Sequence, residues 1–144
     1  VFNSFNLNYR GDRTRKILFN GSLNLGKYYN GDRNSVGATV IFNGGYRFRT
    51  EFGINKNVLK FPSTTIDADI YTLRIKYNHS VNLFNSLYFQ YNAADERLVS
   101  NFRFNLIHSP LSDLFIVYSN ISDLSGENTN NGMIALKFTK LFTF

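Results

Sequence analysis

In the stretch YTLRIKY (residues 71–77), every odd position is a large apolar residue and every even position is threonine, arginine or lysine. A period of two places successive side chains on opposite faces of a β-strand. The stretch therefore predicts a strand with one apolar face and one cationic face. The fold depends on which of the two faces meets water.

The same alternation recurs along the whole chain, and it predicts about nine antiparallel strands with no helix of useful length. The other eight segments lie at 5–10, 17–25, 36–42, 46–54, 87–92, 98–106, 113–120 and 134–144. The segment DLFIVYSN (113–120) is apolar on both faces, so its register is ambiguous. Strands of roughly nine to thirteen residues suit the 9–11 residues that a tilted strand needs to cross a bilayer.

Composition excludes several classes of protein. Aromatic residues make up 17% of the 144 residues, yet the mean hydropathy is −0.23, so apolar and polar residues must be finely interleaved. No stretch approaches the 18 or so apolar residues of a membrane helix. The chain has no cysteine, which removes disulfides, thiol catalysis and thiolate metal sites. The net charge of +6 is spread along the chain without a basic run, so we do not expect nucleic-acid binding.

The connections between the expected strands alternate in length. Short connections are expected around 11–12, 43–45, 78–85 and 109–113. Longer and more polar ones are expected at 26–35, 55–69, 92–97 and 120–132. Outer-membrane barrels have this asymmetry, with tight periplasmic turns and longer external loops. We therefore predict an all-β fold, an antiparallel up-and-down transmembrane β-barrel in the bacterial outer membrane, with the C-terminus on the periplasmic side.

In such a barrel the apolar face meets outer-membrane lipid and the polar face lines the lumen. The predicted lumen-facing residues are Arg47, Arg49, Glu51, Arg74, Lys76, Gln90 and Arg103. We expect Glu51 to pair with Arg47 and Arg49. A ring of cations biases a pore toward anions, but the same side chains could also lock into a filled lumen, and the sequence does not separate the two. A soluble lipocalin-like barrel that binds an apolar ligand, with phenylalanines inside and arginines outside, is the alternative fold.

The last ten residues, ALKFTKLFTF (135–144), predict a closing strand with Phe138, Phe142 and Phe144 facing lipid. This end resembles the C-terminal sorting signal that the barrel-assembly machinery reads. Lys140 falls in the lipid-facing register, and we expect its ammonium group to reach the headgroups. Nine is an odd number, whereas bacterial barrels have an even strand count. Either a strand is miscounted and residues 1–144 are a single barrel domain, or they are the C-terminal part of a larger barrel; we expect the second.

Three segments resemble a known family. They are YYNGDR (28–33), the block FQYNAADERLVSNFRFNLIHSPLSDLFIVYSN (89–120) and the final ALKFTKLFTF. The family consists of Gram-negative outer-membrane proteins with an N-terminal family-9-like carbohydrate-binding module and a C-terminal membrane-associated, hydrolase-like barrel of unknown function. Its recurring turns match Gly31-Asp32-Arg33, Gln90-Tyr91-Asn92 and Pro110 to Asp113. Position 140, usually aromatic in the family, is lysine here, and the module is missing from this sequence.

The resemblance implies a membrane anchor with a pore or transport role in a carbohydrate-related surface system. Carbohydrate would bind to the module that this sequence lacks, not to these residues. The hydrolase label stays open as an alternative, but no catalytic constellation is visible: His79 and His108 fall at expected turns, and adjacent His108 and Ser109 point to opposite faces. Asp123 and Glu127 fit no calcium-loop spacing, so we expect no metal or other cofactor.

Overall fold

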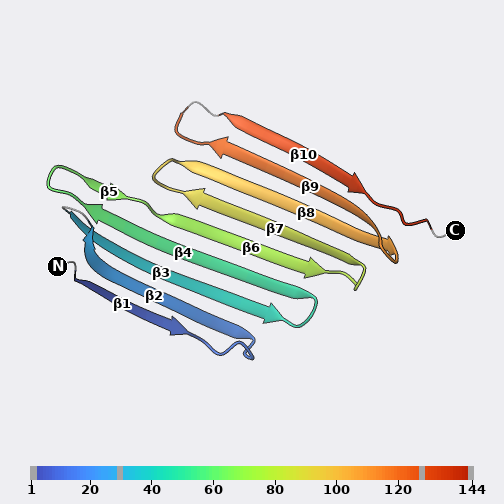
Figure 1. The fold of residues 1–144 in the computed structure, drawn as a ribbon, viewed down its shortest axis with the longest axis horizontal. Helices are drawn as coiled ribbons and strands as arrows, with labels where there is room; N and C mark the ends of the chain where they lie inside the picture. The colour runs from blue at the N-terminus through green and yellow to red at the C-terminus, as the bar shows by residue number, and fades with distance from the viewer. Residues whose placement is uncertain (1–2, 29–30, 127–128, 143–144) are drawn as a thin grey trace.

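The computed structural model describes residues 3–28, 31–126 and 129–142, and in these ranges the chain forms one antiparallel β-sheet (Figure 1). Its strands are β1 (Ser4–Arg10), β2 (Ile17–Tyr28), β3 (Gly31–Gly44), β4 (Phe48–Lys60), β5 (Thr65–Asp67), β6 (Ile70–Asn78), β7 (Leu83–Asn92), β8 (Arg97–Ser109), β9 (Ser112–Asp123) and β10 (Asn130–Phe138). The predicted all-β, up-and-down fold is confirmed. Among the described residues, no helix is long and apolar enough to cross a membrane.

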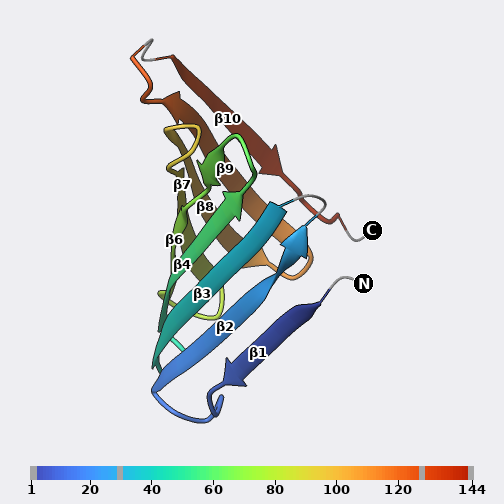
Figure 2. The same cartoon turned by 90° about the vertical axis from the view of Figure 1, so that its left-hand side faces the viewer.

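Each main strand pairs with the next one along the chain, in the order β1-β2-β3-β4-β6-β7-β8-β9-β10. The short strand β5 was not predicted; it pairs with the end of β4 and lies off this path. Figure 2 shows that the sheet curls, with β1 and β10 at its two free edges. Within the described residues these edges do not pair with each other, so the sheet is an open trough and not a closed barrel.

The pairing register sorts the side chains into two continuous faces. In the middle of the sheet Phe52 lies opposite Leu73, which in turn lies opposite Phe89. One residue earlier on β4, Glu51 lies opposite Arg74. Because facing residues of paired strands point to the same side, one face is apolar and the other polar across the sheet.

The register also settles the segment that the sequence left ambiguous. Tyr118 of β9 lies opposite Phe102, which places Tyr118 on the apolar face. Phe115 and Val117 have the opposite parity, so they belong to the polar face. The polar face is therefore less uniformly polar than the sequence predicted.

The polar face is the inner side of the curl. Leu18 and Ile41, which lie opposite each other in the polar register, are only 5% and 8% exposed. Phe52 on the apolar face is 44% exposed, although it sits in a central strand. A Cβ added at Gly53, on the polar face, would lie 2.5 Å from the hydroxyl oxygen of Thr72. Side chains converge on the concave side of a curved sheet, so this crowding identifies the polar face as concave.

The apolar residues form a band that crosses the sheet obliquely. Leu7 of β1 lies opposite Leu23 of β2, and Leu23 lies opposite Val36 of β3. Val36 in turn lies opposite a charged residue, Lys56 of β4. Lys56 is therefore outside the band, and its ammonium group pairs with Asp69 at 3.2 Å. A band that runs at an angle to the strands is what a barrel requires, because its strands tilt by roughly 35–45° against the barrel axis.

The predicted alternation of short and long connections holds only in part: the connections from β4 to β6 and from β9 to β10 are long as expected, but that from β2 to β3 is not. The expected long loop at 26–35 is mostly strand, since β2 extends to Tyr28 and β3 begins at Gly31. Likewise β4 extends to Lys60, five residues past its last pairing with β6 at Asn55. The polar residues at these strand ends continue the backbone hydrogen-bond ladder. As a result, β2, β3 and β4 extend beyond the end of β6.

The final strand is also shorter than predicted. β10 ends at Phe138, and the backbone ladder continues only through the mutual hydrogen bonds of Thr139 and Asp113. Lys140 lies outside the strand, so the register that placed it toward lipid does not apply; its Nζ atom lies 5.0 Å from the centre of the Phe142 ring. Phe142 is 65% exposed, and Phe144 falls outside the described residues.

Candidate site on the polar face of the sheet

Glu51 is the centre of an ion-pair network on the polar face. Its Oε1 accepts a hydrogen bond from Nε of Arg49 at 2.8 Å, and its Oε2 lies 3.7 Å from Nη1 of Arg74. Arg49 also donates to the side-chain oxygen of Asn43 at 3.2 Å. Arg74 takes the place that the sequence assigned to Arg47, because Arg74 lies opposite Glu51 on the neighbouring strand.

Arg47 lies in the turn between β3 and β4 and not in a strand. Its Nε donates to the hydroxyl of Tyr46 at 2.7 Å, and its guanidinium carbon lies 5.3 Å from the Tyr46 ring centre. The other six predicted residues do lie in strands, in the polar register.

Aromatic rings hold two of the arginines in place. The guanidinium carbon of Arg74 lies 5.2 Å from the centre of the Tyr88 ring, and the Tyr88 hydroxyl donates to Gln90 at 2.7 Å. Arg103 lies 5.3 Å from the centre of the Phe115 ring. Such contacts contribute about 0.5–1 kcal/mol at exposed sites and leave the guanidinium N–H groups free to donate in the plane. Both arginines are thus oriented without being fully neutralised.

Three cations converge on a cavity of about 470 Å³ between β6, β7 and β8. Its lining consists of Arg74, Lys76, Ser86, Leu87, Tyr88, Asn101, Arg103 and Val117. Among the residues that the structure describes, no carboxylate lines it. We call it the β6–β8 cavity.

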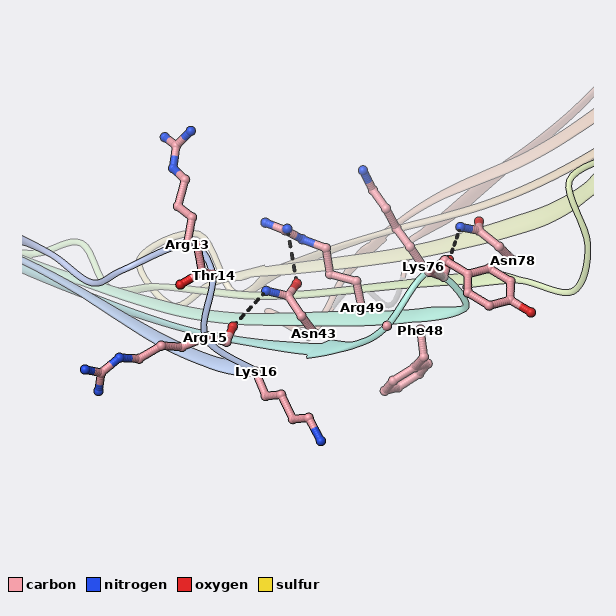
Figure 3. A pocket seen from close by; sticks show the side chains of 11 residues that line it. Arg13, Thr14, Arg15, Lys16, Asn43, Phe48, Arg49, Lys76 and Asn78 are labelled. Atoms are coloured by element: carbon pink, nitrogen blue, oxygen red, sulfur yellow. Dashed lines mark hydrogen bonds between the residues drawn. The ribbon is translucent and has the colours of Figure 1, made fainter.

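A second cavity of about 510 Å³ lies at the end of the sheet where β1 turns into β2 and β3 into β4. Figure 3 shows Arg13, Arg49 and Lys76 on one side of the sheet, while Lys16 and Phe48 point to the other. Lys76 lines both cavities. Arg13, Arg49 and Lys76 thus extend the cationic lining of the β6–β8 cavity along the polar face, and among the described residues no aspartate or glutamate lines either cavity.

The small residues that make the β6–β8 cavity were not predicted from the sequence. Ser86 lies directly opposite both Lys76 and Arg103, so it leaves room between two long cationic side chains. Asn101 and Phe115 were also missed. The missing information is the register between neighbouring strands, which alternation within a single strand does not supply.

The other candidate groups stay apart from this site. His108 lies in β8, and not in a turn as predicted; its ring stacks on Phe138 with centres 5.3 Å apart. His79 follows β6, with its ring 6.3 Å from that of Tyr77. Asp123 accepts hydrogen bonds from Ser125, while Glu127 lies outside the described residues. No group of three potential metal ligands occurs among the residues that the structure describes.

The turn between β1 and β2 is ordered by Asp12. Its Oδ1 accepts hydrogen bonds from the backbone N–H and the hydroxyl of Thr14, both at 2.9 Å. These two donors, the backbone one first, lower the pKa of the Asp12 carboxyl from its ordinary value. The ionised carboxylate fixes the turn that carries Arg13 toward the second cavity.

Comparisons with family models, with curated proteins and with solved structures find no match for this chain. The resemblance to the carbohydrate-module family therefore stays a prediction.

Proposed function

We propose that this chain is part of the wall of an outer-membrane β-barrel, which anchors the protein in the bilayer and lines a path for anionic solutes. The observation that carries the proposal is the apolar face, which is continuous from β1 to β10 and lies on the outer side of the curl. Its most exposed members include Phe5, Leu7, Phe19, Val40, Phe42, Phe52, Ile134, Leu136 and Phe138.

An apolar surface of this extent needs a partner. Monomeric soluble proteins rarely expose contiguous apolar patches larger than a few hundred Å². A lipid bilayer would cover the whole outer face of a curved sheet, whereas a single ligand would cover only part of it. The soluble lipocalin-like alternative requires the phenylalanines to lie inside, and the burial of Leu18 and Ile41 on the opposite, polar side argues against it.

The height of the apolar band fits a membrane. On β8 it runs from Leu98 to Leu106, about 27 Å along the strand. At the tilt typical of barrels this corresponds to roughly 20 Å along the membrane normal, near the ~25 Å apolar band of outer-membrane proteins. Tyr71 and Tyr77 mark the two ends of the band on β6, as interfacial aromatic residues do.

The polar face supports the second half of the proposal. Arg49, Arg74, Lys76 and Arg103 share the concave side, and Glu51 is the acid that pairs with two of them. A surface with this charge balance attracts anions and repels cations. If further strands close the sheet around a lumen, these side chains line it.

Single-cysteine labelling tests the position of the two faces, because the chain has no cysteine of its own. The full-length protein is folded in lipid vesicles with a fluorophore at Val40→Cys or, as the matched control on the opposite face, at Thr39→Cys. We expect brominated lipid tails to quench the probe at position 40, and aqueous iodide to quench the probe at position 39. If the protein stays soluble without detergent and iodide reaches both probes, the proposal is wrong.

A further inference from the structure

We infer that the β6–β8 cavity is a binding site for a small dianionic oxyanion, namely phosphate or a phosphate monoester. The inference deepens the proposed function and rests on it only for the position of the cavity inside a barrel. The chemistry of the cavity follows from its own residues.

The cavity carries more positive charge than its surroundings neutralise. Arg74, Lys76 and Arg103 line it, and the nearest acid, Glu51, is shared between Arg74 at 3.7 Å and Arg49 at 2.8 Å. Within the described ranges, neither Lys76 nor Arg103 takes part in a salt bridge. Lys76 also lies directly opposite Arg49, and like charges in such positions destabilise a sheet, so a bound anion with two negative charges would relieve this repulsion.

Ser86 provides the space for such an anion. Lys76, Ser86 and Arg103 lie in one row of the register on three successive strands. The Cα atoms of Lys76 and Arg103 are therefore about 10 Å apart, twice the spacing between strands. Two long cationic side chains can close over that gap onto one anion, and the serine hydroxyl between them can donate a third hydrogen bond.

The donors are preorganised for an oxyanion and not for a single chloride. The guanidinium carbons of Arg103 and Arg74 lie over the rings of Phe115 and Tyr88, which leaves the guanidinium N–H groups as donors. The side-chain oxygen of Asn101 accepts a 2.5 Å hydrogen bond from Ser119, which leaves its amide N–H groups as donors on the cavity wall. Guanidinium groups match the oxygen pairs of phosphate in a bidentate way, and a spherical anion cannot use that geometry.

Calorimetric titration of the full-length protein, folded in a zwitterionic detergent, with inorganic phosphate tests the inference. We compare Ser86→Leu, which fills the cavity without changing the charge, with Arg103→Gln, which removes one cation. Arg33→Gln is the matched control, because Arg33 is a polar-register arginine of β3 that donates to Ser35 and does not line the cavity. Folding of each variant is checked by its heat-dependent mobility in gels, and Lys76→Gln replaces any variant that does not fold.

We expect saturable phosphate binding in wild type, at least tenfold weaker binding in Ser86→Leu and Arg103→Gln, and unchanged binding in Arg33→Gln. Chloride should not compete at equal concentration. A folded wild type that binds no phosphate, or an equal loss in Arg33→Gln and Arg103→Gln, overturns the inference while leaving the barrel proposal intact. A protein that is soluble without detergent overturns the barrel proposal, whatever the titration gives.

A second titration identifies the source of the phosphate group. The protein is placed in phosphatidylcholine vesicles with or without phosphatidic acid and titrated with glycerol phosphate. Unchanged binding in both vesicles assigns the site to soluble phosphate monoesters. Competition by phosphatidic acid assigns it to a lipid headgroup instead.

Discussion

The two faces of this sheet share one backbone but differ in how crowded and how exposed their side chains are. On the polar face, Leu18 and Ile41 are almost fully buried without any second layer above them. On the apolar face, Phe52 in the central strand β4 remains 44% exposed. The difference shows that curvature buries even apolar side chains on the polar side, and it identifies the apolar side as the outer one.

The strongest test of this comparison places a lysine on each face at neighbouring positions. Phe89→Lys puts a charge in the middle of the apolar band, between Leu73 and Ser100. At the midplane of a bilayer it should destabilise the folded protein by about 2–4 kcal/mol. Urea unfolding of the full-length protein in lipid vesicles measures the change.

The matched control for that variant is Gln90→Lys, one residue further along β7 and on the polar face. We expect its free energy of unfolding to change by less than about 1 kcal/mol, because water and anions can solvate the lysine there. Equal losses in the two variants would mean that the faces meet similar environments, which contradicts a lipid-facing apolar side.

An intermediate effect is expected from adding one methyl group to a glycine on each face. Gly53→Ala on the polar face would push a Cβ atom to 2.5 Å from the Thr72 hydroxyl, which itself donates to the Gly53 carbonyl at 3.4 Å. We expect a loss of about 1–2 kcal/mol from this overpacking. The same urea experiment measures it.

Gly21→Ala on the apolar face is the matched substitution. Its added Cβ would meet the exposed ring of Phe19 at 3.3 Å, and that ring can move outward. Alanine also restricts the unfolded chain, so this variant should be neutral or more stable by up to about 0.5 kcal/mol. A loss at Gly21 as large as at Gly53 would show that the polar side is not the concave one.

The sequence predicted the faces well because alternation is a local property of each strand. YTLRIKY alone assigns Leu73 to one face and Arg74 to the other, and the pairing with β4 and β7 confirms it. It failed where register between strands decides the outcome. The partner of Glu51 turned out to be Arg74 and not Arg47, because a cross-strand neighbour is closer than a residue in the preceding turn.

The site itself was only partly predictable for the same reason. The cations Arg74, Lys76 and Arg103 follow from alternation, but their convergence depends on Ser86, which carries no feature of its own in the sequence. Part of the loop prediction was wrong because the polar residues at 26–28 and 31–35 were taken for a loop. In the structure they extend β2 and β3, whose backbone groups pair regardless of side-chain polarity.

The smallest expected effect on stability is that of changing Glu51. Its carboxylate lowers the net positive charge of the polar face. Glu51→Gln removes the carboxylate that Arg49 and Arg74 share, at 2.8 and 3.7 Å. Both arginines are more than two-fifths exposed, so we expect the free energy of unfolding to fall by only about 0.5–1 kcal/mol. The anion preference of the polar face should rise, because one negative charge is lost beside the cavity.

Ion selectivity of the full-length protein in planar bilayers measures that second effect. We expect the reversal potential in a salt gradient to shift further toward that of a perfectly anion-selective pore. Glu96→Gln is the control: it removes the same charge from the exposed turn between β7 and β8, away from either cavity. A shift of equal size in the control would attribute selectivity to the net charge of the protein and not to the polar face. A shift that is specific to Glu51 would support a solvent-filled path along that face, because a lumen locked by these same side chains passes no ions for Glu51 to influence.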